Sequence, residues 1–258
     1  MNDQAAARAI VSARAGESAA PADLAGLDAA GAYRVQFETE RLLAAERGFQ
    51  PIGWKIGATN PPARAALGLC EPFLGRLYRQ MTSLSPARAT FRPGFHRAYE
   101  AEIALEIGRD LDGRDGPYDA AAIRASTRAV APAIELVGST IAPGGPSGGA
   151  GLIADLAGHA QWIVGAWRTD FAALDLTEAE IALIVNGARV ATGKGANVEG
   201  GPFGATAWLA NALVALGRGL KAGEFVTTGT VIAPAPMGAG QAAVADFGPL
   251  GRVEIVVG

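Results

Sequence analysis

The sequence is short of the residues on which many kinds of functional site depend. Its 258 residues include one cysteine, Cys70, and two histidines, His96 and His159. One cysteine cannot form a disulfide within the chain, and these three side chains are too few for a Cys/His zinc site. Any bound metal ion must therefore be held by oxygen ligands.

Long apolar runs and a strong charge of either sign are also missing. No apolar run reaches the roughly 18 residues that a membrane-spanning helix needs, and the N-terminal residues lack the regions of a secretory signal. With 22 basic and 25 acidic residues, the net charge of −3 gives no field that would attract nucleic acid. We therefore expect a cytoplasmic protein with no membrane partner and no nucleic-acid partner.

The first fifty residues are rich in Ala, Leu, Glu and Arg. Their apolar residues recur at helical spacing over residues 4–15 and 32–47, and a segment with a proline, residues 19–26, joins the two stretches. The pattern predicts an N-terminal helical arm over residues 1–50.

The pattern of apolar residues changes at Pro51. The chain has 35 glycines and 15 prolines, and from this point they separate short apolar runs, which is typical of strands joined by tight turns. We expect one catalytic, β-rich domain over residues 51–258, with helices at 119–130 and 205–216. Asn186-Gly187 between two β-branched runs predicts a hairpin. Residues 142–155, which are rich in glycine, are expected to form a flexible loop that is either functional or a surface excursion.

The segment Ala98–Gly108 alternates between apolar and acidic residues, as a strand with two different faces would. Glu100, Glu102 and Glu106 fall on one face, and neighbours on a face lie about 7 Å apart. The carboxylates of Glu100 and Glu102 can therefore converge, and a hard divalent cation would relieve their repulsion. The alternative is a solvated polar face on an edge strand.

Glu135 is the only charged residue in the apolar run Ala131–Gly138. An unpaired charge is costly in such surroundings, so this carboxylate needs a partner. Three glutamates with water or substrate oxygens would match the all-oxygen coordination that Mg²⁺ or Mn²⁺ prefers. A buried salt bridge from Glu135 to an arginine is the alternative.

Lys55 lies between Trp54 and Ile56 in a short apolar run that ends at a glycine. With Thr59 just beyond it, the lysine is suited to hold an anionic substrate group. The alternative is a lysine that reaches solvent from an edge strand. Thr227, Thr228 and Thr230 surround Gly229 and suggest a strand end at a pocket, although threonine is common in strands of any kind.

Several segments resemble one known family in their order and spacing. They are GWKIGATN, EPFLGRLY, YEAEIALEIGRDL, APAIELVGS, LIADLAGHA, NGARVATGKGANVEGGP, WLANALVALGRGLKAGEFVTTGT and ADFGPLGRVEIV. They are similar to the 2-oxo-4-pentenoate hydratase and 4-oxalocrotonate decarboxylase branch of the fumarylacetoacetate hydrolase superfamily. The resemblance covers nearly the whole chain, and its most specific part is Glu100-x-Glu102 followed by Glu135 in an Ile-Glu context.

The resemblance implies an α+β fold in which a mixed, rolled β-sheet, like that of the C-terminal domain of fumarylacetoacetate hydrolase, follows an N-terminal helical arm. It also implies homo-oligomers, and Mg²⁺ or Mn²⁺ held by Glu100, Glu102 and Glu135. In this family the metal ion binds the carboxylate and 2-oxo oxygens of a 2-oxo acid or its enol and acts as a Lewis acid. Lys55 would add a second positive charge there.

Two further pocket residues follow from the resemblance, and two family carboxylates are missing. Asp155 and Thr230 would line the pocket. Many hydratases of this group carry Asp-Asp-Met where this chain has residues 79–81, and an aspartate where it has Gly138. Because water addition needs a proton donor, His159 is a candidate replacement acid or base. The alternative is a histidine that is merely packed in a turn.

These observations favour a metal-dependent lyase for short 2-oxo acids in the catabolism of aromatic compounds, most simply a 2-hydroxypenta-2,4-dienoate hydratase. The alternatives are a decarboxylase of a 2-oxo dicarboxylate, an acylpyruvate hydrolase, and a catalytically silent homologue that partners a related hydratase or decarboxylase. A cation at the distal end of the pocket would favour a substrate with a second carboxylate. Arg64, Arg76 and Arg79 are the candidates for that cation.

Overall fold

The computed structural model describes residues 2–18, 24, 26–142 and 147–258. The predicted joint at residues 19–26 lies almost wholly outside the described residues. Within them, no helix is both long and apolar enough to cross a membrane.

Two helices form the N-terminal arm, as the sequence predicts. They are α1 (Asp3–Ala15) and α2 (Ala29–Arg47). The side chains of Asn2 and Asp28 accept hydrogen bonds from the first turns, and left-handed Gly16 and Gly48 end the two helices. The apolar faces of the arm share a core with Phe73 and other sheet residues. The division of the chain at residue 50 stays a prediction, because arm and sheet are packed together.

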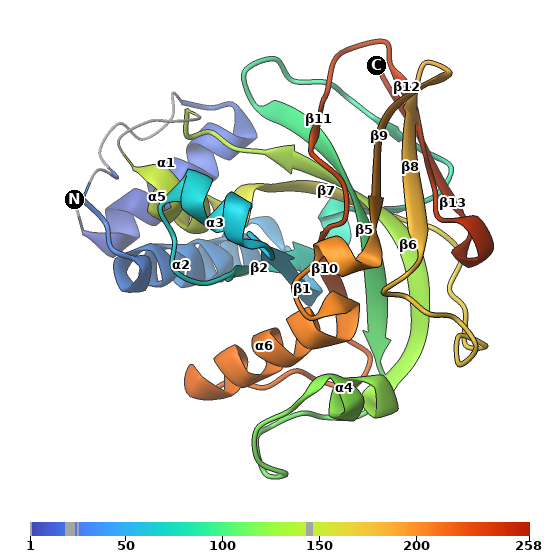
Figure 1. Cartoon of the computed structure of the whole chain (residues 1–258). Coiled ribbons are helices and arrows are strands. Elements are labelled where there is room, and N and C mark those ends of the chain that lie inside the picture. Colours follow the sequence, from blue (N-terminus) through green and yellow to red (C-terminus); the bar gives the residue numbers. More distant parts are fainter. Residues whose placement is uncertain (1, 19–23, 25, 143–146) are drawn as a thin grey trace.

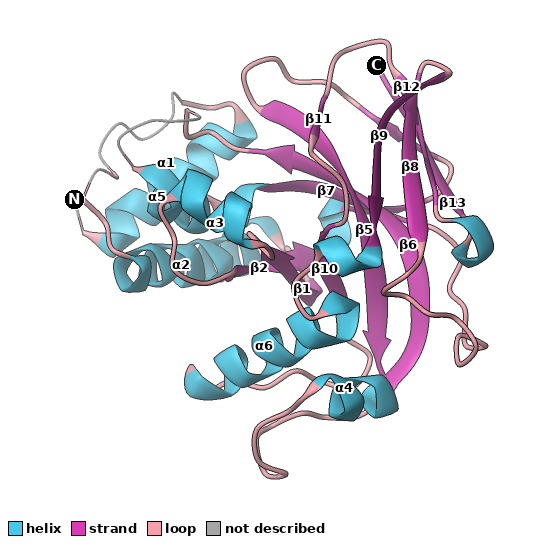
Figure 2. Cartoon of the chain, viewed as in Figure 1, coloured by secondary structure: helices cyan, strands magenta, loops and turns pink. Residues whose placement is uncertain are grey.

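Two β-sheets make up the body of the molecule (Figures 1 and 2). The larger sheet has the strand order β2-β1-β10-β5-β6-β7-β3, with β11 paired to β5, and the smaller has the order β4-β13-β12-β8-β9. The strands of the larger sheet are β1 (Pro51–Gly57), β2 (Phe73–Tyr78), β3 (Thr82–Leu84), β5 (His96–Ile107), β6 (Thr127–Gly138), β7 (His159–Val164), β10 (Phe225–Thr230) and β11 (Ala235–Pro236). Those of the smaller sheet are β4 (Ala87–Ala89), β8 (Glu180–Val185), β9 (Ala188–Lys194), β12 (Ala242–Asp246) and β13 (Arg252–Val257). The expected α+β fold with a curled mixed sheet is confirmed.

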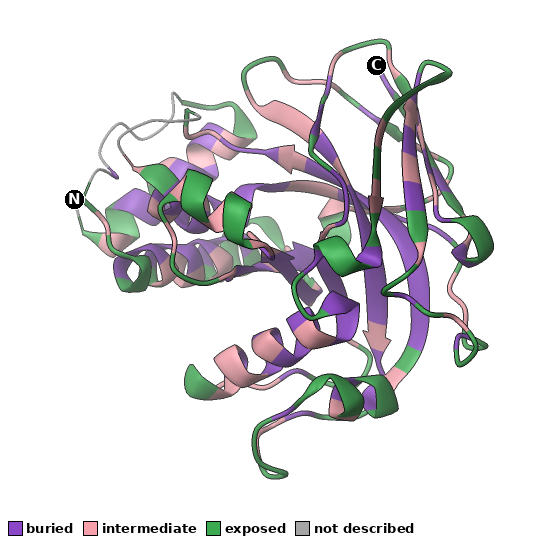
Figure 3. Cartoon of the chain, viewed as in Figure 1, coloured by how far each residue is buried: buried purple, intermediate pink, exposed green. Residues whose placement is uncertain are grey.

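The two faces of the larger sheet have different neighbours. From Tyr99 onward, the odd-numbered residues of β5 enter the main core, which also takes in apolar residues of the smaller sheet and of α6 (Gly201–Ala215). The opposite face lies toward α1, α2 and α5 (Gly148–Ala154), which gather on one side of the sheet in Figure 1. Figure 3 shows β5 and β6 buried over most of their length. Two charged residues on the face toward the arm, Glu102 and Glu135, are fully buried.

Several local predictions need correction. The helix expected at 119–130 is α4 (Ala120–Ser126), which ends because β-branched Thr127 starts β6. The stretch read as strands also contains α3 (Pro61–Leu67), which Asn60 caps. The described part of the expected loop at 142–155 contains α5, and the helix expected at 205–216 begins earlier, at Gly201. The hairpin at Asn186-Gly187 is confirmed, with positive φ at both residues.

Candidate functional site

Three glutamates converge on the arm-facing side of β5 and β6. The register of this antiparallel pair sets Glu100 opposite Glu135, and Glu102 is the next residue of β5 on the same face. One carboxylate oxygen from each glutamate lies within 4.8 Å of the others. Glu102 and Glu135 are fully buried and Glu100 is partly exposed. The three predicted ligands therefore form one group that could hold a metal ion.

Glu102 and Glu135 are each held by contacts to only one of their two carboxylate oxygens. Oε2 of Glu102 accepts hydrogen bonds from the Thr227 hydroxyl at 2.6 Å and from the Gly229 amide at 2.9 Å. Oε1 of Glu135 lies 2.9 Å from Nζ of Lys55 and 2.9 Å from Nδ1 of His159. The second oxygens, Oε1 of Glu102 and Oε2 of Glu135, are buried without a hydrogen-bond partner among the described residues. Because an unsatisfied buried carboxylate oxygen is costly, this donor set fits a divalent cation.

The charges in this group are coupled. Burial raises the pKa of Glu100 to about 7, partly offset by Lys55. Burial and the neighbouring glutamates also raise the pKa of Glu102. Burial alone would raise the pKa of Glu135, but the charge of Lys55 and the contact with His159 outweigh it, so that this pKa is lowered. Glu135 is thus the ionised partner of Lys55, whereas Glu100 and Glu102 favour ionisation only beside a further positive charge.

Lys55 is positively charged, whereas the ring of His159 is neutral. Burial would lower the pKa of Lys55, but Glu135, Glu100 and Glu102 together raise it, so the ammonium is retained. Burial lowers the pKa of His159 despite its contact with Glu135. The neutral ring therefore donates its Nδ1–H to Glu135.

A cavity of about 880 Å³ opens beside the carboxylates. Its walls include Lys55 and Glu100 together with the predicted substrate contacts Thr59 and Thr230. Most of the other lining residues are apolar, which is usual for a small-molecule site with a few polar anchors. Four residues singled out from the sequence therefore share one cavity.

Asp155 and His159 are not among the residues that line this cavity. Asp155 is buried, accepts hydrogen bonds from the Ser139 and Thr140 hydroxyls and the Thr140 amide, and forms an ion pair with Arg14 at 3.3 Å. The Arg14 guanidinium also donates to the His159 carbonyl oxygen. Asp155 thus has several partners within the fold, and its contact with substrate stays a prediction.

The three arginines that the sequence offered as candidates for a distal cation lie outside this cavity. Arg64 pairs with Glu199, Arg76 pairs with Glu40 and Glu224, and Arg79 contacts Gln50; none of the three lines the cavity. Arg97, which sequence reasoning missed, does line it. Strict alternation continued back from Tyr99 would put Arg97 on the core face, and no sequence signal marks the bulge between His96 and Ala98.

The two missing family carboxylates differ in their surroundings. Arg79 lies in a short 3₁₀ turn, Arg79–Met81, whose residues do not line the cavity. At Gly138 a Cβ atom would approach Ala160 and Phe95 to 2.7 Å. This position therefore has no room for an aspartate in the fold as it stands.

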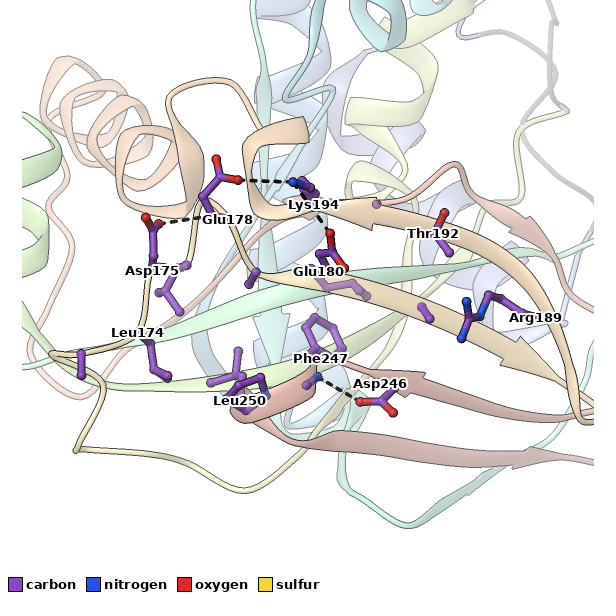
Figure 4. Close-up of a pocket in the computed structure, with 18 residues that line it drawn as sticks. Leu174, Asp175, Glu178, Glu180, Arg189, Thr192, Lys194, Asp246, Phe247 and Leu250 are labelled. Atoms are coloured by element: carbon purple, nitrogen blue, oxygen red, sulfur yellow. Dashed lines mark hydrogen bonds and ion pairs between the residues drawn. The ribbon is translucent and has the colours of Figure 1, made fainter.

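A second hollow of about 860 Å³ lies between β8, β9 and the turn after β12 (Figure 4). Figure 4 shows Lys194 between Glu178 and Glu180. The Nζ atom of Lys194 lies 3.3 Å from Oε2 of Glu178 and 3.8 Å from Oε1 of Glu180. None of the predicted site residues lines this hollow. Lys194 pairs with the two glutamates and Asp246 pairs with Arg252, and we assign this hollow no role.

The chain is similar to several characterised enzymes, although no protein-family model matches it. It is 33% identical over 212 residues to 2-hydroxyhexa-2,4-dienoate hydratase of Comamonas testosteroni, covering 81% of this chain and 79% of that protein. It is 34% identical over 210 residues to 2-keto-4-pentenoate hydratase of Burkholderia vietnamiensis, covering 80% and 77%.

Solved structures of related enzymes share the fold of this chain. The 4-oxalocrotonate decarboxylase from Pseudomonas putida G7, complexed with magnesium and adipate, superposes with a TM-score of 0.91 and 27% identity over 99% of this chain and 97% of that one. Fumarylpyruvate hydrolase from Pseudomonas aeruginosa, in complex with Mn²⁺ and pyruvate, shares the fold at a TM-score of 0.60 and 15% identity, over 79% and 88%. The chain therefore belongs to the 2-keto-4-pentenoate hydratase family and is an enzyme of the hydro-lyase or carboxy-lyase type.

Proposed function

We propose that this enzyme is a divalent-metal-dependent hydratase that acts on a short 2-hydroxy-2,4-dienoic acid, such as 2-hydroxypenta-2,4-dienoate, in the breakdown of aromatic compounds. The observation that carries the proposal is the convergence of three carboxylates beside Lys55 at the wall of one cavity. The names of the curated relatives support it.

Glu100, Glu102 and Glu135 would hold the metal ion, which we propose to be Mg²⁺ or Mn²⁺. All three offer hard oxygen ligands, and no Cys or second His adjoins them to favour a softer metal among the described residues. When bound, the ion would supply Lewis-acid catalysis. The buried oxygens of Glu102 and Glu135 that lack a hydrogen-bond partner support this assignment.

Lys55 would stabilise negative charge that develops on the substrate. Its ammonium lines the cavity and is fixed by the Ala157 carbonyl and Glu135, each at 2.9 Å. A preorganised cation of this kind is worth most where charge forms in the transition state. Thr59 and Thr230, which line the same cavity, would help to orient the substrate.

His159 would act through Glu135. Its ring donates to Oε1 of Glu135 and is not among the cavity residues, so we propose that it orients this ligand. Asp155 would likewise position the turn that carries His159, through the shared contact with Arg14.

The net reaction adds one water molecule. Carbon 4 of the dienoate gains the hydroxyl, carbons 3 and 5 each gain a proton, and the 2-hydroxyl gives up its proton to become the 2-oxo group. Loss of the dienoate's ultraviolet absorbance measures this reaction. We expect turnover with Mg²⁺ or Mn²⁺ that EDTA abolishes; metal-independent turnover, or none with any dienoate tried, would contradict the proposal.

Decarboxylation of a 2-oxo dicarboxylate is the second candidate reaction. The specific observation in its favour is the TM-score of 0.91 to 4-oxalocrotonate decarboxylase. Release of carbon dioxide from such a substrate, measured beside the hydratase assay with the same protein, separates the two reactions.

We further propose that the protein is a homo-oligomer and that it can associate with a related hydratase or decarboxylase. Exposed apolar side chains on both sheets, Leu84, Val190 and Val256, support an interface. Light scattering on the purified chain tests the first idea, since a monomeric mass would contradict it. Co-elution with a purified 4-oxalocrotonate decarboxylase tests the second.

A further inference from the structure

Arg97 lies at an irregular point of β5. His96 pairs with Gly138 and Ala98 pairs with Val137, so Arg97 is an extra residue with no partner of its own on β6. Such a bulge re-aims the side chain of the inserted residue. Arg97 consequently lines the cavity with Ala98 and Glu100, on the side of the sheet opposite the main core.

The Arg97 guanidinium is anchored but its charge is not balanced by the described residues. Nη2 donates to the Ser139 and Ile141 carbonyl oxygens at 3.2 and 3.3 Å. Nε is buried and has no hydrogen-bond partner, and no carboxylate of the described ranges forms an ion pair with Arg97. The other cavity cation, Lys55, already has Glu135. Arg97 is thus a fixed cation whose Nε–H donor has no partner among the described residues.

The position of Arg97 along β5 suits the far end of a substrate. It lies three residues from Glu100, which corresponds to about 10 Å along a strand. Ala98 and Val137, which face each other across β5 and β6, line the cavity between the two ends. A short carbon chain beside these apolar residues would have one end at the carboxylate group and the other near Arg97.

We propose that Arg97 is a specificity-determining residue that binds a second carboxylate of the substrate. Among the short acids covered by the proposed function, the enzyme would then prefer one with a carboxylate at its far end, as a 2-oxo diacid or its enol has, to the monoacid given there as the example. The planar guanidinium suits a carboxylate because it offers two parallel donors. The inference rests on the proposed function, because it assumes that the 2-oxo end lies at Glu100, Glu102 and Glu135.

The test compares 2-oxoadipate with 2-oxohexanoate, two acids of equal chain length, by calorimetric titration with Mg²⁺ present. The variants are Arg97→Met, Arg97→Lys and the control Arg79→Met, which removes an exposed arginine outside the cavity. We expect the wild type to bind the diacid about 10- to 100-fold more tightly, as a charge-assisted hydrogen bond would give. Arg97→Met should bring this ratio close to one, Arg97→Lys should leave an intermediate ratio, and Arg79→Met should keep the wild-type ratio.

Three results would overturn the proposal: a wild type without preference for the diacid, a ratio that survives in Arg97→Met, or an equal loss of both acids in that variant. The last result would assign Arg97 to the end that the two acids share. Should Arg97→Met not fold, the wild-type ratio and Arg97→Lys still decide. Titration of EDTA-treated protein separates the two proposals. Diacid binding that needs Arg97 but no metal ion would support this inference and contradict the proposed function. If neither acid binds under any condition, both proposals are contradicted.

Discussion

The ammonium of Lys55 lies 2.9 Å from Oε1 of Glu135, and both side chains are almost wholly buried. The two residues come from β1 and β6, which are not adjacent in the sheet. The lysine neutralises the charge of one of the three clustered carboxylates. The charges of the other two are left to be balanced by another cation. Lys55 therefore has a structural task in the metal-free protein and, by our proposal, a catalytic one in the active enzyme.

Replacing Lys55 with methionine separates these tasks. We expect Lys55→Met to keep metal binding, since no proposed ligand is lost, and to lower the turnover number by about 100-fold or more. Calorimetry and the dienoate assay measure the two properties. Lys221→Met, which removes an exposed lysine paired with Asp110, is the control. An unaltered turnover number would remove Lys55 from the mechanism.

Glu102→Gln tests the carboxylate group itself. The amide oxygen can still accept from Thr227 and Gly229, so the fold should persist, whereas the affinity for Mg²⁺ should fall by about two orders of magnitude as a ligand charge is lost. Glu106→Gln changes a glutamate on the same face of β5 that pairs with Arg128, and should leave the affinity unchanged. Equal affinities in Glu102→Gln and wild type would rule out Glu102 as a ligand.

Thr227 and Thr228 form a matched pair. The Thr227 hydroxyl donates to Glu102, whereas the Thr228 hydroxyl donates to the Ile103 carbonyl. Thr227→Val should weaken metal binding about 10-fold because a ligand loses its orienting partner. Thr228→Val should cost about 1 kcal/mol of folding stability and leave metal affinity intact. The reverse pattern in calorimetry and urea denaturation would contradict this assignment.

Arg14 connects the arm to the site. It pairs with Asp155 and donates to the His159 carbonyl, and its side chain is 6% exposed. Because Arg14→Met leaves a buried carboxylate without its cation, we expect a loss of about 3–5 kcal/mol in urea denaturation. Arg8→Met on the same helix removes an exposed pair with Glu46 and should cost about 1 kcal/mol or less. Equal losses in the two variants would show that the buried pair contributes nothing particular.

His96 makes folding stability depend on pH. Burial, together with the charges of Arg92 and Arg14, lowers the pKa of this ring, whose Nδ1 accepts a hydrogen bond from the Arg92 amide at 2.9 Å. The unfolded chain therefore takes up a proton near the ordinary histidine pKa of about 6.5 while the folded chain does not, so this contribution is present above that pH and is lost as the pH falls through it. Urea midpoints on either side of about pH 6.5 measure the loss. His96→Asn, which keeps an acceptor but cannot titrate, should lose less; the same slope in both proteins would contradict the assignment.

Regular geometry explains what could be predicted from the sequence. Strand alternation places Glu100 and Glu102 on one face whatever lies around them, and the lone charge of Glu135 in an apolar run needs a partner in any fold. Positive φ at Asn186-Gly187 follows from the turn alone. These inferences depend only on neighbours in the chain.

The rest depended on distant contacts or on irregular backbone. Arg97 reaches the cavity through a bulge that could not be predicted from the residues around it. Asp155 pairs with Arg14 from another helix, so its motif alone could not show that its carboxylate is already used. The glycines of α5 oppose a helix by propensity, but Gly149 lets the helix approach Leu67 and Leu69, where a Cβ atom would be 2.8 Å or less from both.

The position of β10 also bears on how the molecule folds during synthesis. The strand of residues 225–230 lies between β1, which carries Lys55, and β5, which carries Glu100 and Glu102. Until Phe225 and the rest of β10 have left the ribosome, β1 and β5 lack the strand that lies between them. The edges of β1 and β5 that pair with β10 therefore stay unpaired until late in translation. Such non-local pairing slows folding and lengthens exposure to aggregation.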